Sequence, residues 1–273
     1  MSLEAEIIGF TNWLQTPPGK YLLAWEQGQF DRAVSDIFGY HALQLGFTEL
    51  NALRTNRMPH QWRAASTAGA DSDDETMLDP SSSRMCAALV TDSGALPFPA
   101  ASLDLVVLPH TLELGDDAHE TLREVERVLM PEGRIVISGF NPASLWGMRQ
   151  RREHFYARFG RKELFLPEAG DFIGYWRLRD WLRLLSFEVE SARFGCYRPA
   201  LTTENWLSRF EWMDNAGQKW WPIFGSVYFL VAVKRVRGTR LLEPVRKARS
   251  PVLAVPASVA NKNPNCNLHN NLL

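Results

Sequence analysis

Residues 103–138 constrain the fold of this chain more than any other segment. Leu103–Leu108 is a nearly continuous apolar run, typical of a strand that is covered on both faces. Asp117 is of a residue type that caps helices and precedes a helical apolar pattern. A turn at Met130–Gly133 leads into Arg134–Ser138, which is rich in β-branched residues. Strand, helix, turn and strand make a βαβ unit, so the two strands are predicted to be parallel.

Further apolar segments extend this unit into an α/β sheet. We expect a helix from Arg177 to Leu185, and the remaining strands are predicted at residues 42–45, 85–91, 187–194 and 225–233. A long loop separates the last two strands. This separation favours an antiparallel edge on a mostly parallel sheet.

Composition excludes several classes of protein. The chain has 273 residues, is 45% hydrophobic and carries a formal net charge of -1, so neither disorder nor a strongly basic nucleic-acid binder is expected. The cysteines Cys86, Cys196 and Cys266 are too far apart in sequence for a metal motif or a disulfide framework. No apolar run is long enough to span a membrane, and the acidic N-terminus is unlike a secretory signal. We therefore expect a cytoplasmic protein without a metal.

Two consecutive segments carry a resemblance to a known family. LVTDSGALPFPAASLDLVVLPHTLE, residues 89–113, is followed by LREVERVLMPEGRIVISGF, residues 122–140. Together they resemble the class I S-adenosylmethionine-dependent methyltransferases, and more narrowly the type 11 methyltransferase-domain subgroup. The resemblance implies an α/β, Rossmann-like, seven-stranded, mostly parallel sheet with helices on both faces and an antiparallel edge strand.

The resemblance also implies where S-adenosylmethionine would bind. Ligands of open α/β sheets lie outside the carboxyl ends of the strands. By position, Asp92 would accept from the adenine amine, Ser93 would add a backbone contact, and Gly46 would let the backbone approach the cofactor. The full set of implied cofactor-binding residues is Gln44, Gly46, Phe47, Asp92, Ser93, Leu108, Pro109 and His110.

The first glycine motif departs from the family pattern and is degenerate. Gln44 stands where the family has an acid, and Thr48 and Leu50 stand where it has glycines. Glycine loops work because a missing Cβ permits positive φ and close backbone approach. The predicted end of the second strand, QWRAAS at residues 61–66, also lacks the acid that would hold the ribose.

The domain organisation follows from shifts in composition. We expect an N-terminal helical cap at residues 1–35 and a methyltransferase domain at 36–236. Residues 64–83 read as a flexible loop and 141–175 as a lid-like insertion. Residues 237–273 begin basic and are predicted to end in a disordered tail.

The sequence leaves several alternatives open. The basic, aromatic segment 141–175 fits either a lid over a small-molecule acceptor or an RNA-binding surface. The altered glycine motif favours a second class of function, a catalytically silent binding or scaffold protein. A nucleotide-binding reductase is a third interpretation, which the motifs at 89–140 disfavour.

No catalytic residue is assigned from the sequence. His110 is either a general base or a structural histidine. Neither the methyl acceptor nor the oligomeric state follows from the sequence, although the aromatic residues from Trp206 to Trp221 suit either core packing or a dimer face.

Overall fold

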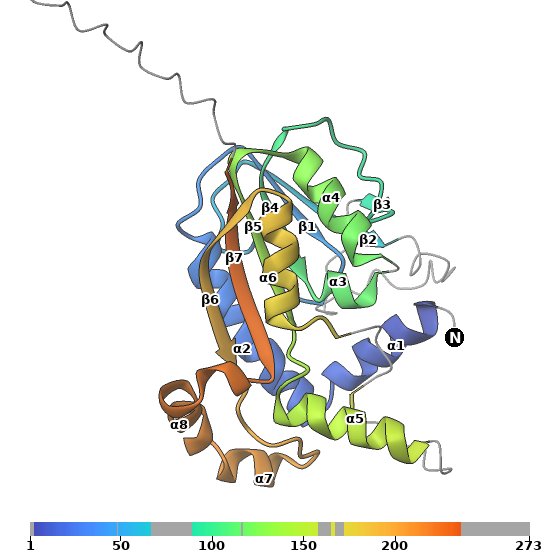
Figure 1. Ribbon diagram of the computed structural model, residues 1–273, viewed down its shortest axis with the longest axis vertical. Coiled ribbons are helices and arrows are strands. Elements are labelled where there is room, and N and C mark those ends of the chain that lie inside the picture. The colour runs from blue at the N-terminus through green and yellow to red at the C-terminus, as the bar shows by residue number, and fades with distance from the viewer. Residues whose placement is uncertain are drawn as a thin grey trace, which may run out of the picture. The chain divides into compact units, whose positions relative to one another are not determined.

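The protein is built around one twisted sheet with helices on both faces (Figure 1). The computed structural model describes residues 3–47, 49–66, 89–115, 117–157, 165–166 and 172–235. Within these ranges the sheet has seven strands in the order β3-β2-β1-β4-β5-β7-β6. The strands are β1 (His41–Leu45), β2 (His60–Ser66), β3 (Leu89–Thr91), β4 (Leu103–Pro109), β5 (Leu129–Phe140), β6 (Phe187–Gly195) and β7 (Val227–Lys234).

The pairing confirms the predicted fold class. Strands β1 to β5 are mutually parallel along the sheet, whereas β7 is antiparallel to both of its neighbours, β5 and β6. The antiparallel region therefore lies at one edge, with β7 beside the edge strand β6. Because β7 runs the other way, β6 is itself parallel to β1–β5, and its carboxyl end reaches the same end of the sheet.

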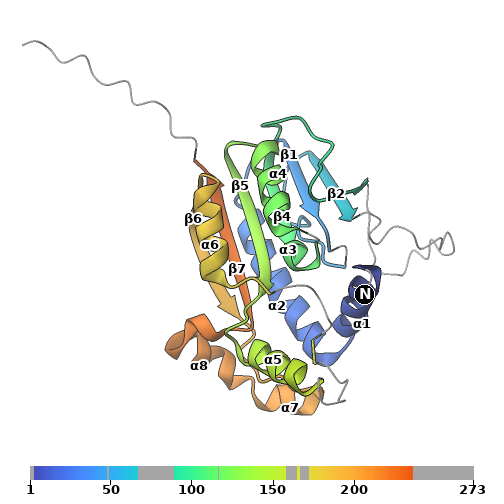
Figure 2. The ribbon, with the colours of Figure 1, turned by 45° about the vertical axis from the view of Figure 1, so that its right-hand side comes forward.

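The helices form a layer on each face and a group at one end (Figures 1 and 2). In both views α4 and α6 cover one face, α2 lies behind the sheet, and α5, α7 and α8 gather below it. The helices are α1 (Leu3–Leu14), α2 (Pro17–Val34), α3 (Thr111–Leu114), α4 (Ala118–Val128), α5 (Leu145–Ala157), α6 (Tyr175–Leu184), α7 (Glu204–Arg209) and α8 (Trp212–Trp220), with a 3-10 turn, η2, at Pro222–Phe224.

Alternation along the strands creates two apolar layers. On β4, Leu105 and Val107 face the α1–α2 side, whereas Val106 and Leu108 face α4 and α6. All of these side chains are fully buried, so β4 is covered on both faces, as its continuous apolar run predicts.

Local sequence signals account for the helix starts. Asp117 caps α4 by accepting from the backbone N–H groups of His119 (2.7 Å) and Glu120 (3.2 Å). A proline occupies the first turn of α2, where its missing N–H costs no hydrogen bond. The turn predicted at Met130–Gly133 lies within β5 as a break in its register with β4.

Several expectations fall outside the described residues. These are most of the loop at 64–83, the tail at 237–273, parts of the insertion at 141–175, and residues 85–88 of the third predicted strand. The divisions into cap, domain and tail therefore stay predictions. In the described part of the insertion, α5 follows β5 directly at the carboxyl end of the sheet.

Candidate functional site

The loop after β1 requires its single glycine for a packing reason. Gly46 has φ +87°, and a Cβ there would lie 2.7 Å from Oγ1 of Thr111. Thr111 in turn donates from Oγ1 to the carbonyl of Leu45 at 2.6 Å, which holds the start of α3 against the end of β1. The space beside Gly46, where a Cβ would lie, is therefore filled by the side chain of Thr111.

The side chain of Gln44 also forms hydrogen bonds within this loop. Its side chain is buried, and its Nε2 donates to the carbonyls of Phe47 (2.8 Å) and Leu50 (2.6 Å). Its Oε1 accepts from the N–H of Ala52 at 3.0 Å. A carboxylate at position 44 could not donate to the two carbonyls, so the amide is required by this loop conformation.

Aromatic side chains close the space beyond the loop. Phe47 is 6% exposed, and its ring centroid lies 5.3 Å from that of Phe10 on α1. Phe10 also lies 5.3 Å from the ring of His110, and Trp13 lies 6.1 Å from Phe140. Helix α1 thus packs over the carboxyl ends of β1, β4 and β5.

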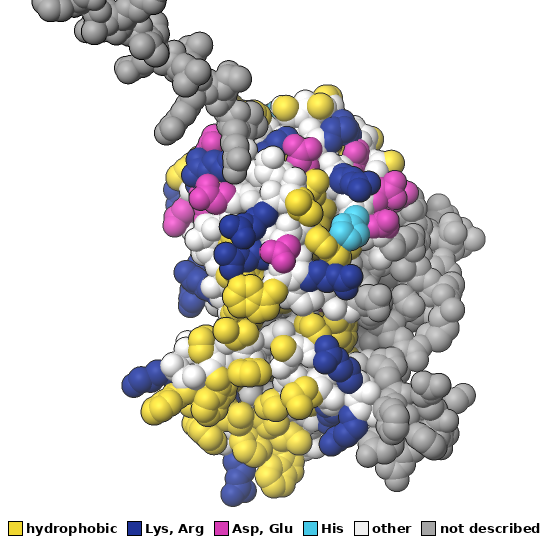
Figure 3. Space-filling view, in the orientation of Figure 1, with side chains coloured by type: hydrophobic (Ala, Val, Ile, Leu, Met, Phe, Trp, Pro, Cys, Tyr) yellow, Lys and Arg dark blue, Asp and Glu magenta, His cyan; other side chains and the backbone are white. Residues whose placement is uncertain are grey.

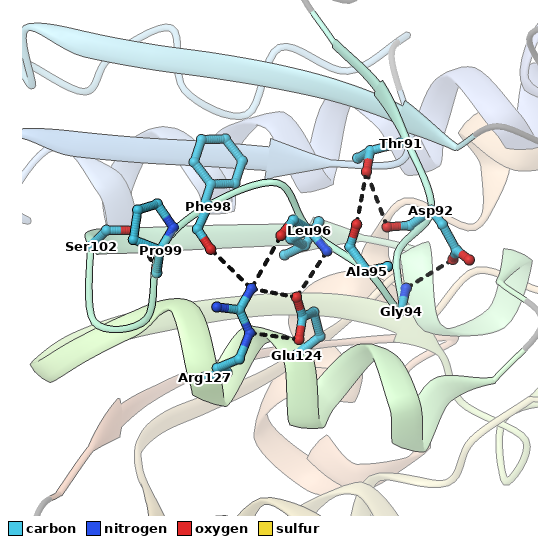
Figure 4. A network of polar contacts seen from close by, with 10 residues as sticks. All are labelled: Thr91, Asp92, Gly94, Ala95, Leu96, Phe98, Pro99, Ser102, Glu124 and Arg127. Atoms are coloured by element: carbon cyan, nitrogen blue, oxygen red, sulfur yellow. Dashed lines mark hydrogen bonds and ion pairs between the residues drawn. The ribbon is translucent and has the colours of Figure 1, made fainter.

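The turn after β3 leaves a carboxylate available. Asp92 is exposed, and its Oδ1 accepts from the N–H of Gly94 at 2.9 Å (Figure 4). Its Oδ2 has no hydrogen-bond partner in the part of the chain that the structure describes. Ser93 is 8% exposed and its hydroxyl accepts from Oγ1 of Thr121 at 2.9 Å. Asp92 therefore has one oxygen fixed by the turn and one free for a ligand.

The same turn is held in place from below by α4. The guanidinium of Arg127 donates to the carbonyls of Leu96 (3.1 Å) and Phe98 (2.9 Å), and Glu124 accepts from the N–H of Leu96 at 2.9 Å (Figure 4). Arg127 also pairs with Glu124. These bonds explain why the LPFP segment has one defined conformation beside Asp92.

The predicted site residues lie at one end of the sheet but form two groups. Gln44, Gly46 and Phe47 follow β1, whereas Leu108, Pro109 and His110 end β4, which neighbours β1. Asp92 and Ser93 follow β3, and β2 lies between β3 and β1, so they are about 10 Å farther along the sheet. No acidic residue occurs in β2, as the sequence indicates.

His110 stands between two buried carboxylates. Its Nδ1 is 2.9 Å from Oε2 of Glu113, and its Nε2 is 2.9 Å from Oε1 of Glu26 on α2. All three side chains are almost completely buried. Burial opposes a charge on the ring, but Glu26 and Glu113 outweigh it and raise the pKa of His110 to about 10.

A protonated His110 has no lone pair to accept a proton at neutral pH. The raised pKa favours the structural interpretation of His110 over the general-base interpretation in this conformation. Burial also raises the pKa of Glu113, whose Oε1 accepts from the N–H of Phe140 at 2.5 Å. The group therefore links α2, β4 and β5 as a structural cluster.

Several polar atoms near this cluster lack aligned hydrogen bonds within the described residues. They are both carboxylate oxygens of Glu26, Nε2 of His110, Oγ of Ser138 and the hydroxyl of Tyr228. The Glu26–His110 contact is therefore an ionic contact at 2.9 Å without hydrogen-bond alignment. A Cβ on Gly139 would lie 2.5 Å from the Tyr228 hydroxyl and 2.9 Å from Oε1 of Glu113, so these groups share one small region. Buried polar atoms without partners favour a polar ligand in this region.

Sequence reasoning missed Glu26 and the aromatic cover from α1. A signal for Glu26 exists, because Leu22, Glu26 and Phe30 share one face of α2 at a spacing of four residues. A charge in the middle of such an apolar stripe indicates a buried partner. No comparable signal identifies Phe10 as the residue that covers the loop after β1.

The insertion after β5 is less available to nucleic acid than its composition suggests. Trp146 is fully buried, and its Nε1 donates to the carbonyl of Arg198 at 2.8 Å. Arg149 pairs with Glu153 at 2.6 Å and lies over the ring of Phe165. Of the described basic residues here, Arg151 and Arg152 are exposed.

The described residues contain no group of His, Cys, Asp and Glu side chains arranged to hold a metal ion. A helix long and apolar enough to cross a bilayer is likewise not found among them.

The residues present fit one half of an adenosyl ligand better than the other. Asp92 offers a fixed and accessible acceptor for an adenine amine. At the β1 end, both N–H donors of the Gln44 amide are used within the loop, and the rings of Phe47 and Phe10 fill the adjacent space. In this conformation the β1 end does not fit the methionine part.

Comparisons with known proteins agree on the family. A family profile described as "Methyltransferase domain", of type 11, matches residues 55–137. The uncharacterized protein YafS of Escherichia coli (strain K12) is 31% identical over 185 residues, which cover 67% of each chain.

Two solved structures share the fold. A SAM-dependent methyltransferase of Thermotoga maritima has TM-score 0.53 at 13% identity, covering 84% of this chain and 96% of that one. Another, from Archaeoglobus fulgidus, has TM-score 0.51 at 16% identity, covering 78% and 94%.

Strand order, the turn at Asp92 and these matches lead to one conclusion: the chain belongs to the class I S-adenosylmethionine-dependent methyltransferases and carries a type 11 methyltransferase domain.

Proposed function

We propose that the protein is an S-adenosylmethionine-dependent methyltransferase that acts on a small-molecule acceptor. The observation that carries the proposal is the turn after β3, where Asp92 keeps one free carboxylate oxygen at the carboxyl edge of a methyltransferase sheet. An RNA acceptor is less well supported, because Trp146 and Arg149 in the basic insertion are already engaged by the protein.

In this proposal Asp92 accepts from the adenine amine and the backbone near Ser93 contacts the ring. Gly46, Leu108, Pro109 and His110 line the part of the site near the methyl group, and Gln44 and Phe47 shape the loop beside it. S-adenosylmethionine supplies an electrophilic methyl group, whose transfer is helped mainly by positioning of the acceptor. The charged His110 is a positioning group rather than a base, because Glu26 and Glu113 hold its proton.

Entry of the methionine part requires α1 to move. Phe10 leaves the space beyond Gly46 and stays displaced while the ligand is bound. The polar atoms of Ser138, Tyr228 and Glu26 that lack partners are candidates to bind the acceptor.

A second candidate is a catalytically silent protein that keeps the fold without the cofactor. The observation that favours it is the loop after β1, where Gln44 bonds three groups of its own loop and Phe47 packs against Phe10. In that case α1 is a permanent part of the core.

Titration calorimetry of the full chain with S-adenosylhomocysteine separates the two candidates. The methyltransferase proposal expects a saturable heat, together with faster amide exchange in α1 when ligand is present. If the folded protein gives no heat at high concentration, and denatured preparations release no adenosyl compound by mass spectrometry, the silent alternative holds.

The acceptor class needs a separate experiment. Tritiated S-adenosylmethionine is incubated with the protein and cell extract, and the extract is then divided into RNA, protein, lipid and small-molecule fractions. We expect label in the lipid or small-molecule fraction. Label confined to RNA would contradict the acceptor class proposed here while leaving the methyltransferase activity in place.

A further inference from the structure

Six large hydrophobic side chains are exposed together in the segment between β6 and β7. Trp220 is 73% exposed, Trp212 60% and Phe224 54%. The aromatic face, as we call it, consists of Trp206, Trp212, Trp220, Trp221, Ile223 and Phe224. Figure 3 shows hydrophobic side chains gathered over α7 and α8, with Lys and Arg side chains at the margin. The Asp and Glu side chains visible in that view lie over the upper half of the molecule.

The inner side of this segment is firmly attached to the domain. Tyr197 is buried, and its hydroxyl donates to the carbonyl of Pro222 at 2.8 Å. Gly217 packs directly on the Tyr197 ring, since a Cβ there would lie 2.3 Å from it. Asp214 pairs with Arg198 at 2.9 Å and accepts from the hydroxyl of Tyr21 on α2. The aromatic face is therefore presented outward by a fixed scaffold rather than by a loose loop.

A contiguous apolar patch on a fixed surface indicates an interaction site. Four of the six side chains are tryptophans, which favour the boundary between water and hydrocarbon because the ring is apolar and its N–H is polar. The remaining two, Ile223 and Phe224, follow Pro222 in a short 3-10 turn. Tryptophan together with phenylalanine and an aliphatic side chain is typical of surfaces that rest on a bilayer.

Two cations at the margin are placed to contact an anionic surface. Arg209 and Lys219 lie on α7 and α8, and neither forms an ion pair with a described residue. Arg209 lies over the ring of Trp206, with 5.6 Å between its guanidinium and the ring centroid. Glu204 and Glu211 are also exposed on this segment, and Glu211 lies 3.9 Å from Arg198. The two unpaired cations stand beside the tryptophans, where lipid phosphates would lie.

We propose that the aromatic face docks the protein reversibly on the surface of a bilayer that contains anionic lipid. Insertion is shallow: the rings enter the headgroup region while Arg209 and Lys219 contact lipid phosphates. An RNA strand fits this surface less well, because Ile223 offers no stacking ring and only these two unpaired cations lie within the segment. A second copy of the chain is the competing occupant, and sedimentation velocity distinguishes it from a bilayer.

The experiment uses the full chain and vesicle flotation. Vesicles of phosphatidylcholine with phosphatidylglycerol are compared with phosphatidylcholine alone, at low and high salt. We expect binding to the mixed vesicles, weakened by salt, with a blue shift of tryptophan fluorescence. The double variant Trp220→Ala/Phe224→Ala is expected to lower the partition coefficient at least about tenfold. Arg209→Gln/Lys219→Gln is expected to lower it about fivefold for each cation removed, on mixed vesicles alone.

The matched control is Phe38→Ala/Tyr40→Ala. These two aromatic side chains are at least as exposed but precede β1, at the other end of the sheet. Their removal is expected to leave partition unchanged, and equal thermal unfolding of both double variants shows that the comparison concerns the surface alone.

Three outcomes overturn the proposal. One is an absence of vesicle binding by the wild-type chain. Another is equal binding by the wild type and the Trp220→Ala/Phe224→Ala variant, which would assign binding to a different surface. The third is a dimer in sedimentation velocity, or binding of a labelled oligouridine, that disappears in the same variant while vesicles do not bind.

Discussion

Glu26 and His110 are 84 residues apart in sequence, yet Oε1 of one lies 2.9 Å from Nε2 of the other, and both side chains are fully buried. The contact joins α2 to the carboxyl end of β4. With Glu113 on the opposite side of the ring, it places a charged imidazole in the middle of the domain.

Removal of one partner tests this cluster. We expect Glu26→Gln to lower the free energy of unfolding by about 3–5 kcal/mol at pH 6.5, because burial raises the pKa of Glu113 and makes Glu26 the main counter-charge of the buried imidazole. The control is Glu188→Gln, since Glu188 pairs with Arg235 on the surface, where such pairs contribute about 0–1 kcal/mol or less. Urea unfolding measures the free energy of unfolding of both variants. Similar decreases in the two would contradict the proposed contribution of the buried contact.

The same cluster predicts a pH dependence. The pKa of His110 is about 10 in the folded state and about 6.5 when unfolded. Its stabilising contribution is therefore fully present below pH 6.5 and is lost as the pH rises towards 10. We expect unfolding free energies to fall across this window in the wild type and to fall less steeply in Glu26→Gln. Parallel curves for the two proteins would show that His110 is not the group that titrates.

Gln44 gives a prediction that runs against the family pattern. Gln44→Glu restores the residue type usual at this position, but a carboxylate cannot donate to the carbonyls of Phe47 and Leu50. We expect a loss of about 1–3 kcal/mol for each buried carbonyl left without a partner. Gln218→Glu, on the exposed side of α8, is expected to change stability by less than about 0.5 kcal/mol. Chemical denaturation would reject the assignment if Gln44→Glu were as stable as the wild type.

Gly46 and Gly28 form a second matched pair. Gly46→Ala places a Cβ at φ +87° and 2.7 Å from Thr111, so we expect a loss of about 1–3 kcal/mol. Gly28→Ala lies inside α2 with open space around it and is expected to gain about 0.5–1 kcal/mol. Thermal unfolding of both variants gives the comparison, and changes of the same sign would count against the close approach at Gly46.

Asp92 connects the proposed function to a binding measurement. Asp92→Asn keeps an oxygen to accept from the N–H of Gly94, so we expect unchanged stability. The loss of a charged acceptor is expected to weaken S-adenosylhomocysteine binding by about 10–100-fold. Calorimetry on the full chain measures the change. Equal affinities for the wild type and Asp92→Asn would place the adenine elsewhere.

The elements of the sheet could be predicted from sequence because their signals are local. Leu103–Leu108 is apolar except for Asp104, and Asp117 marks the helix start that the structure confirms. The antiparallel edge followed from two late apolar runs separated by a long loop. In the same way, the motif at residues 89–98 located the turn that carries Asp92.

Other features depend on contacts between distant segments. Glu26 contacts His110 because of the path that α2 takes across the sheet. No local sequence pattern specifies that path. The degenerate glycine motif was visible in the sequence. The hydrogen bonds that the Gln44 amide makes within the loop were not, because they depend on the conformation of the loop. The exposure of the tryptophans from Trp206 to Trp221 was not predictable, because α7 and α8 are too short for an apolar period to identify the outer side.

The reversed direction of β7 has a consequence for how this protein can vary. Gly195 pairs with Val227, so the end of β6 and the start of β7 are neighbours in the sheet. Residues 196–226 therefore leave and re-enter the ladder at the same point, as the tip of a hairpin does. The outer surface of this module can therefore change in length and sequence without a shift in the register of any strand, provided that the inner contacts of Arg198 with Trp146 and of Asp214 with Tyr21 are kept.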